Sequence, residues 1–384
     1  MSTEVLAELG LVDHHCHGVV QHELTRQQFA ALATESGFAP PVGGDHLMSQ
    51  VGTAITRWCP PLLGLDVHTD IDTYLARRAE LGPTVVNQRL LTAAGSGRLL
   101  IETGYRGDEI ATTGAMAELA GCPVSEVVRI ETVAEQMVRD GAGPHEIAQD
   151  FAQALAVRTV DAVGLKSVVA YRYGLDFDPA RPTLAEVRAA AERWLGGTPS
   201  ERNRVSDPVL LRHLLWSAVD VAGPRQLPLQ FHVGYGDSDL DLFRVDPTRM
   251  SGWLRAVQPS GMPVMLLHCY PFQREAAYLA AVFPHVYCDV GLAVPYSGPR
   301  STEILAEMLE IAPFHKVLYS SDAFGLAELY VLGAALFRRG LSRLLDSWVA
   351  DGDWSPNRAA VVANLVGRDN ALRVYQLDPI TSTR

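Results

Sequence analysis

Short apolar runs alternate with longer segments of helical periodicity along most of this chain. Continuous apolar character in such runs is typical of parallel strands that are covered on both faces. We expect strands at residues 9–17, 97–104, 127–131, 163–170, 227–234, 263–270, 286–291 and 316–322. Helical patterns fill most of the intervals, at 132–157, 183–195, 208–223, 247–257, 273–283, 301–312 and 326–346. Eight strands alternating with helices predict an α/β fold, a (β/α)₈ TIM barrel.

One long segment, residues 19–95, separates the first two predicted strands. Its pattern is helical and is broken at FAPPVGG and CPPLLG, so we expect a helical cap near the mouth of the barrel. A second excess, around 171–206, follows the fourth strand, and the tail SPNRAAVVANLVGRDNALRVYQL predicts a closing amphipathic helix. The whole chain, 1–384, is therefore predicted to be a single barrel with the insertion inside it.

The alternative is a doubly wound open sheet with a separate helical domain. That fold needs a glycine-rich phosphate turn after an early strand. The nearest candidate, AAGSGRLL, has its glycines before a strand rather than at the start of a helix. This difference favours the barrel.

Composition excludes several partners. The formal net charge of −12 argues against nucleic acid, because phosphates would be repelled. No apolar run reaches the roughly 20 residues of a membrane span, and the first ten residues do not resemble a signal peptide. Five scattered cysteines without a CxxC pair indicate reduced thiols. We expect a soluble, cytoplasmic protein that forms a homo-oligomer and acts on a small molecule.

The first predicted strand ends in DHHCH, which places His15 and His17 two residues apart. Side chains two apart on a strand share a face, so both imidazoles would reach one ion. Asp13 would lie below them on that face as a buried acceptor. His14 and Cys16 are expected to face the outer helices and are excluded from the site.

Three later strands also end in residues that can bind metal: His232, His268 and Asp322. The carboxyl ends of barrel strands meet at one face, where such residues would converge. Histidines with a carboxylate suit zinc or another borderline divalent ion, with one position left for water. Lys166 lies within the fourth predicted strand, where burial of a charged amine is costly unless the amine has a partner. Three interpretations are possible. The amine reaches the metal site, it carries a carbamate that bridges two ions, or it extends to the mouth of the barrel.

Several cations and phenols follow the strand ends and are candidates for binding a substrate carboxylate. A guanidinium can pair with a carboxylate through two parallel hydrogen bonds. The candidates are Arg172, Tyr173, Arg106, Arg274 and Tyr105, with Arg172 preferred. No GxSxG elbow, GxxxxGK[ST] loop or paired CxxC motif offers a competing chemistry.

Taken together, DHHCH, His232, His268 and Asp322 resemble the amidohydrolase superfamily, of the amidohydrolase-2 type. GLKSVVAYRYGL, HCYPFQREAAYLAAVFPHVYCDVG and SSDA are similar to the FluG-like amidohydrolase domain that fungi carry fused to a glutamine-synthetase-like module. The resemblance implies a metal-binding barrel and suggests hydrolysis of a carbon–nitrogen bond, such as that of a γ-glutamyl amide.

In the mechanism that this resemblance implies, His15, His17, His232 and Asp322 hold one divalent ion. Asp322 accepts a proton from the attacking water, while His268 stabilises the developing oxyanion. With a second ion, Lys166 and His268 would join the ligands. Two alternatives stay open: a metal-dependent decarboxylase or lyase of a small carboxylic acid, and a non-catalytic metal barrel that partners a glutamine-synthetase-like enzyme.

Overall fold

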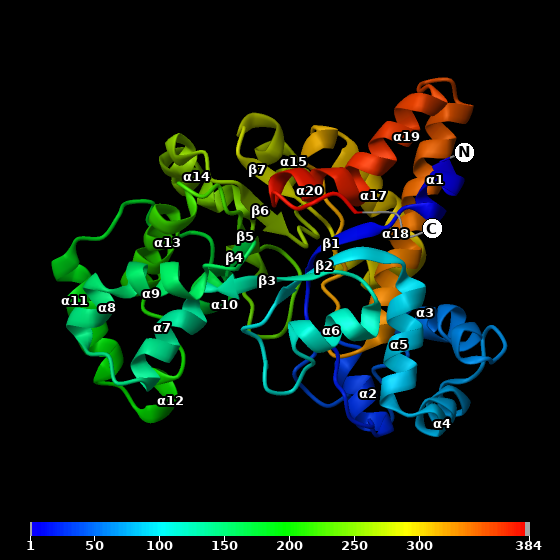
Figure 1. Ribbon diagram of the computed structural model, residues 1–384, viewed down its shortest axis with the longest axis horizontal. Coiled ribbons are helices and arrows are strands. Elements are labelled where there is room, and N and C mark those ends of the chain that lie inside the picture. Colours follow the sequence, from blue (N-terminus) through cyan, green and yellow to red (C-terminus); the bar gives the residue numbers. More distant parts are fainter. Residues whose placement is uncertain (1, 381–384) are drawn as a thin grey trace.

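A single sheet of seven parallel strands lies at the centre of the computed structural model, which describes residues 2–380 (Figure 1). The strands are β1 (Leu11–Cys16), β2 (Ser96–Glu102), β3 (Val124–Arg129), β4 (Gly164–Ser167), β5 (Leu229–His232), β6 (Val264–Leu267) and β7 (Val286–Cys288). Their order in the sheet is their order in the sequence. Every neighbouring pair is parallel, as helical crossovers between consecutive strands require.

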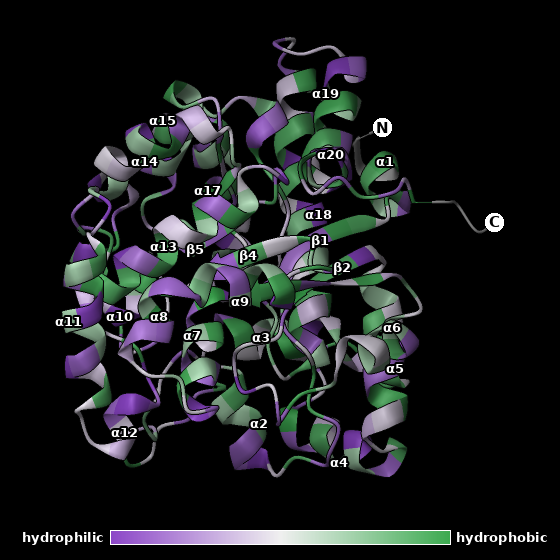
Figure 2. Ribbon diagram, turned by 60° about the vertical axis from the view of Figure 1, so that its left-hand side comes forward, coloured by the Kyte–Doolittle hydropathy of each residue, from purple (hydrophilic) through white to green (hydrophobic). Residues whose placement is uncertain are grey.

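Helices follow every strand and carry their apolar faces toward the sheet. In Figure 2 the strands are largely hydrophobic, and the surrounding helices turn polar residues outward. Before β5 they are α1 (Ser2–Glu8), α2 (Arg26–Leu32), α3 (Gln50–Trp58), α4 (Ile71–Leu81), α5 (Pro83–Ala94), α6 (Thr113–Ala120), α7 (Ile130–Arg139), α8 (Pro144–Gln149), α9 (Phe151–Arg158), α10 (Val169–Arg172), α11 (Leu184–Leu195), α12 (Pro199–Arg202) and α13 (Pro208–Ala222). After β5 they are α14 (Ser251–Val257), α15 (Gln273–Val282), α16 (Ala293–Ser297), α17 (Ser301–Leu309), α18 (Ala327–Ala350), α19 (Pro356–Asn364) and α20 (Asn370–Val374).

The eighth predicted strand is a backbone segment that closes the ring without forming a regular strand. Leu318 N donates to Cys288 O on the β7 side, while His14 N donates to Tyr319 O and Asp322 N to His15 O on the β1 side. The regular ladder is interrupted because Ser321 N donates instead to the carboxylate of Asp13, at 3.0 Å. The (β/α)₈ plan is confirmed, but the prediction of a full strand at 316–322 was wrong.

The interior of the ring holds its own apolar cluster. Side chains from β1, β2, β3 and β6 meet there with residues of the closing segment and of the chain from α20 onward: Val12, Leu100, Val127, Met265, Leu267, Leu318, Ala371, Val374 and Tyr375. On β2 and β3 the residue two positions further along is charged, Glu102 and Arg129. The amino ends of the strands are therefore filled by apolar packing, and the polar groups gather toward the carboxyl ends, as in other barrels of this kind.

An irregularity in β1 changes which side chains face inward. The pairing of β1 with β2 shifts between Asp13 and Cys16, so the simple alternation of faces fails there. The imidazoles of both His14 and His15 consequently contact interior side chains. The prediction that His14 faces the outer helices was wrong, as was the placement of Asp13 beneath the His15–His17 pair. Cys16 packs, as expected, with the outer core.

Residues 19–95 fold into α2–α5, next to the barrel at the lower right of Figure 1. A buried ion pair fastens this insertion to α18, because Arg78 Nε donates to Glu328 Oε1 at 2.6 Å. Tyr74 Oη donates to the same oxygen at 2.7 Å. The loop that follows α2 lies over the carboxyl ends of the strands, where residues 34–37 line the main cavity.

One further helical prediction was wrong in extent. The segment 132–157 is three helices, α7, α8 and α9, because Gly141 has a positive φ of 94° and Pro144 starts a new helix. The closing helix predicted in the tail is confirmed: α19, a π-helical turn at Leu365–Asp369 and α20 form one continuous helical segment.

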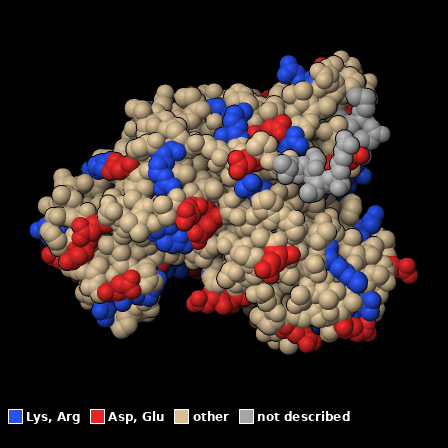
Figure 3. Space-filling model, viewed as in Figure 1, with Lys and Arg blue, Asp and Glu red and all other residues tan. Residues whose placement is uncertain are grey.

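Acidic and basic side chains are interspersed on the face shown in Figure 3, without a large patch of one sign. Among the described helices, none combines the length and the apolar character needed to cross a bilayer.

Candidate metal centre

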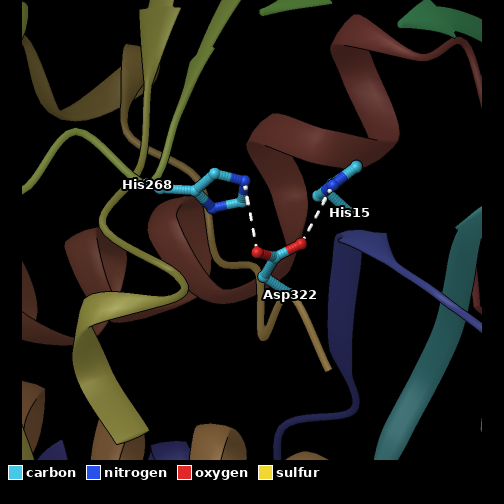
Figure 4. Close-up of side chains that lie close together, drawn as sticks. All are labelled: His15, His268 and Asp322. Atoms are coloured by element: carbon cyan, nitrogen blue, oxygen red, sulfur yellow. Dashed lines mark ion pairs between the residues drawn. The ribbon is translucent and has the colours of Figure 1, made fainter. Parts of the chain in front are cut away.

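The ends of β1 and β6 bring three imidazoles around the carboxylate of Asp322. His15 Nε2 lies 3.1 Å from Asp322 Oδ1, and His268 Nε2 lies 3.4 Å from Oδ2 (Figure 4). His17 Nε2 lies 3.5 Å from Oδ1. His268 and Asp322 follow β6 and the closing segment, where both residues have positive φ, 70° and 50°. These strained turns aim the two side chains at the β1 histidines.

The protons of the two β1 imidazoles are fixed by buried acceptors on their far sides. Gln230 Nε2 donates to His14 O at 2.8 Å, so Gln230 Oε1, 2.8 Å from His15 Nδ1, must accept from that nitrogen. His17 Nδ1 likewise donates to Glu102 O at 3.1 Å. Each Nε2 atom then carries a lone pair, and both lone pairs point at the ionised carboxylate.

Burial also favours neutral histidines at this centre. Desolvation lowers the pKa of His15 to about 3 and the pKa of His268 to about 4. An unprotonated nitrogen and a carboxylate oxygen at these distances repel each other unless a cation lies between them. His232 Nε2 and both ring nitrogens of His268 are buried, without a hydrogen-bond partner among the described residues. The donor set therefore fits a divalent cation of the borderline class, such as zinc.

The residues predicted to bind the ion lie together, and His268 joins them. The ligand atoms of His15, His268 and Asp322 lie within 4.8 Å of one another, and His17 Nε2 lies beside them. The ring of His232 packs between Tyr171, at 4.5 Å, and His268, at 4.8 Å. His268 was predicted to act in catalysis off the ion, but the turn at its positive φ brings its ring to the carboxylate.

Lys166 projects from β4 into the same space. Its side chain is 3 % exposed, and Nζ lies 3.5 Å from His15 Nε2. Burial lowers the pKa of this amine to about 8. The alternative in which the amine extends to the mouth is wrong for this chain, because the amine ends at the metal centre.

A second layer of buried polar groups holds these residues in place, and sequence reasoning missed most of it. Asp289 Oδ1 accepts from the backbone of His268, at 2.9 Å, and of Gly291, and Oδ2 pairs with His14 Nε2 at 2.8 Å. Tyr375 Oη joins His14 to Gln230. Asp289, directly after β7, could have been found as one more polar residue at a strand end. Tyr375 gave no such signal, because α20 reaches the interior only in the folded chain.

A cavity of about 540 Å³ opens above the metal centre. Its lining contains His15, His17, Lys166, His232, His268 and Asp322. Four arginines also line it: Arg106, Arg129, Arg172 and Arg204. The cavity therefore joins a candidate cation-binding centre to a wall of arginines, each of which is paired with a carboxylate.

Arg172 and Arg129 are the buried members of this wall. Arg172 pairs with Glu135 at 3.1 Å, and Arg129 with Glu102 at 2.5 Å; each arginine side chain is 10 % exposed. Arg172 Nη1 and Arg129 Nε nevertheless lack hydrogen-bond partners among the described residues. Guanidinium groups at a cavity wall are suited to binding an anion.

Of the other residues predicted to bind substrate, some line the main cavity and some do not. Arg106 lines the cavity, although it is half exposed and pairs with Glu109. Tyr173 lies against the Arg244 guanidinium, 4.5 Å from the ring, and does not line the cavity. Arg274 projects from α15 to Glu307 and Glu310 on the surface. A substrate role for Tyr173 and Arg274 is therefore contradicted, because helix and turn geometry carry them away from the mouth.

Comparisons with known proteins agree with this site. The family model described as Amidohydrolase matches residues 127–377. Protein fluG of Emericella nidulans is 32% identical over 279 residues, covering 66% of this chain. The chain spans about a third (32%) of the length of that relative, so the resemblance concerns one part of it.

Solved structures show the same fold. A protein of Lactobacillus casei, provisionally described as a metal-dependent hydrolase, has 28% identity and a TM-score of 0.86, with 97% of each chain covered. A uronate isomerase from Bacillus halodurans has 13% identity and a TM-score of 0.60, covering 99% of this chain and 96% of its own, and shares the fold alone. The chain thus has the fold of a metal-dependent hydrolase and belongs to the amidohydrolase family.

Proposed function

We propose that this chain hydrolyses a carbon–nitrogen bond in an amide whose acyl part carries a second, free carboxylate, such as a γ-glutamyl amide. The observation that supports the proposal most strongly is the convergence of two lone pairs, on His15 and His17, upon the carboxylate of Asp322. In the neutral form neither imidazole donates there, because its proton is held on the opposite nitrogen. A cation held between these donors would stabilise the arrangement.

His15, His17, His268 and Asp322 would hold the ion in this proposal, with His232 next to them. A divalent cation at such a site acidifies a water molecule and polarises a carbonyl oxygen. Zinc fits the imidazole and carboxylate donors. The number of ions depends on Lys166: a carbamate formed there from carbon dioxide would supply a further anionic ligand beside His15.

Asp322 acts as the proton carrier. Its carboxylate faces the cavity, accepts the proton of the attacking water and returns it to the leaving nitrogen. His268, neutral and buried, would hold the ion from the end of β6. The products are a carboxylate and an amine, so water supplies the oxygen of the new C–O bond while the C–N bond breaks.

Arg172 and Arg129 bind the free carboxylate of the acyl part. Glu135 and Glu102 hold the two guanidinium groups in position at the wall of the main cavity. Binding a remote carboxylate here would fix the scissile carbonyl near Asp322, which lowers the entropic cost of reaching the transition state.

The test is a panel of carboxylate-bearing amides and the corresponding unsaturated and aromatic acids, assayed with the zinc-loaded protein. We expect release of amine from the amides, and release of carbon dioxide from none of the acids. Asp322→Asn should lower kcat by about 10²- to 10⁴-fold, the usual contribution of a general acid–base group. Asp220→Asn makes the same change in a surface pair with Arg181 and should leave kcat unchanged.

Two results would contradict the proposal. Carbon dioxide release without amine release would replace it with the decarboxylase alternative. Full activity of the zinc-loaded Asp322→Asn protein would remove Asp322 from the reaction. A separate variant tests the carboxylate site: Arg172→Gln should raise KM for amides that carry the free carboxylate and leave KM for their neutral counterparts unchanged.

A further inference from the structure

A second cavity, of about 350 Å³, adjoins the main one on the side of β6 and β7. Every described residue that lines it is uncharged, and three are tyrosines: Tyr235, Tyr270 and Tyr296. Apolar side chains from α3, α16 and α17 complete the walls, among them Ala293. Its chemistry therefore contrasts with that of the arginine-lined main cavity.

The two cavities share a thin boundary. Thr34, from the loop after α2, and Tyr296, from α16, line both of them. Glu35 lines the main cavity next to this boundary, and its carboxylate is hydrogen-bonded to Tyr296. A molecule in the main cavity thus needs to pass only the side chains of Thr34 and Tyr296 to enter the second.

The position of the second cavity in the ring decides what can enter it. Arg129 ends β3 and Arg172 follows β4, whereas Tyr296 lies in the first helix after β7. In a closed ring of eight segments, the third and fourth lie opposite the seventh and eighth. A substrate held by its carboxylate at the arginines therefore extends across the metal centre, toward Tyr296 and the second cavity.

We propose that the second cavity is the subsite for the amine portion of the amide, and that this portion is an uncharged alkyl or aryl group. The proposal rests on the hydrolytic function given above. The acyl part with its carboxylate lies against Arg129 and Arg172, and the substituent on the amide nitrogen passes Tyr296. Water adds its oxygen to the acyl carbon, the C–N bond breaks, and the nitrogen leaves with the proton carried by Asp322.

The uncharged lining fits a neutral substituent. An alkyl or aryl group gains by leaving water for a cavity whose described lining carries no charged side chain.

The experiment uses one acyl group and a series of N-alkyl amides from methyl to hexyl, followed by benzyl. Each methylene buried from water should raise kcat/KM by about fourfold until the cavity is filled. Ala293→Leu narrows the cavity and should lower kcat/KM for hexyl and benzyl amides, while that for the methyl amide is retained. Tyr235→Ala widens it and should shift the preference to larger groups.

A matched variant separates the subsite from general effects on α16. Val294→Leu also enlarges a buried side chain of this helix, but Val294 does not line the second cavity. It should keep the wild-type dependence on chain length. Equal loss of that dependence in Val294→Leu and Ala293→Leu would overturn the assignment.

A binding measurement keeps this inference distinct from the proposed reaction. Ketones in which a methylene replaces the amide N–H cannot be hydrolysed, so their dissociation constants, measured by calorimetry with the zinc-loaded protein, report the subsite alone. Affinity that rises with chain length in the wild type, and not in Ala293→Leu, supports the subsite even if no amide is cleaved. Cleavage of the methyl amide, with ketone affinity independent of chain length, would overturn the subsite and leave the reaction standing.

Discussion

Gln230 is the residue that fixes the proton of His15, and replacing it should weaken metal binding as well as the fold. Its side chain is fully buried on β5 and makes hydrogen bonds of 2.8 Å to His15 Nδ1, His14 O and Tyr375 Oη. Gln230→Leu keeps the approximate volume and removes all three. His15 Nδ1–H then has no acceptor, so its ring is free to rotate or to change tautomer.

Gln230→Leu is expected to lower both the unfolding free energy and the affinity for zinc, and the two effects can be estimated separately. Each buried polar group left unpaired, such as His15 Nδ1–H or His14 O, costs about 1–3 kcal/mol of unfolding free energy. Loss of the group that orients a metal-binding histidine lowers metal affinity by about 10- to 100-fold. With zinc at about 100 times the wild-type dissociation constant, binding stabilises the wild type by about 2.7 kcal/mol, and the variant by only about 0.4–1.4 kcal/mol.

The assay is chemical denaturation of each protein with zinc and with a chelator, which gives the stabilisation by zinc as a difference. Gln273→Leu is the matched control: it changes another buried glutamine, on α15 and outside the main cavity. This control should lose stability in both conditions and keep the full zinc increment. A full increment in Gln230→Leu would refute the argument that Gln230 sets the tautomer of His15.

Three further outcomes are expected from other parts of the structure. Glu328→Gln should cost about 3–5 kcal/mol of unfolding free energy, since it leaves the buried Arg78 without its charged partner. Glu80→Gln, in an exposed pair, should change the unfolding free energy by less than about 1 kcal/mol. Chemical denaturation measures both. Burial and the nearby charge of a lysine lower the pKa of His285 to about 4, so the unfolded chain binds a proton at a higher pH than the folded chain does. The unfolding free energy of the wild type should therefore fall as the pH drops from 6.5 toward 4. Denaturation at a series of pH values should show a smaller fall for His285→Asn. Gly236→Ala would place a methyl group 2.8 Å from His232 Nε2, so kcat should drop by about 10²-fold while circular dichroism stays that of the folded protein; unchanged kcat would contradict the packing described.

Much of the fold could be predicted because the alternation of strands and helices in a barrel is visible in the hydrophobic pattern of the sequence. Parallel strands are buried on both faces, and the helices between them alternate with them at nearly constant spacing. The positions of β1–β7 follow from that pattern. The closing segment and the division of 132–157 did not, because they depend on Asp13 reaching Ser321 and on the local turns at Gly141 and Pro144.

The candidate site was predictable to the extent that its residues end strands. His15, His17, His268 and Asp322 do so, and the structure brings them together. The set of contacts was less predictable. Arg274 and Tyr173 also follow strand ends, yet neither lines the main cavity. A small change of position along a helix or loop is enough to direct a side chain away from it.

The sequence by itself determined that imidazoles and a carboxylate would meet at the carboxyl ends of a strand ring, since residue type and strand period are local properties. Only the tertiary structure decided how they meet. The shift within β1 turns both His14 and His15 inward, the positive φ of His268 brings that ring to Asp322, and Gln230 sets the proton of His15. Each of these depends on contacts between residues distant in the chain, which no local pattern encodes.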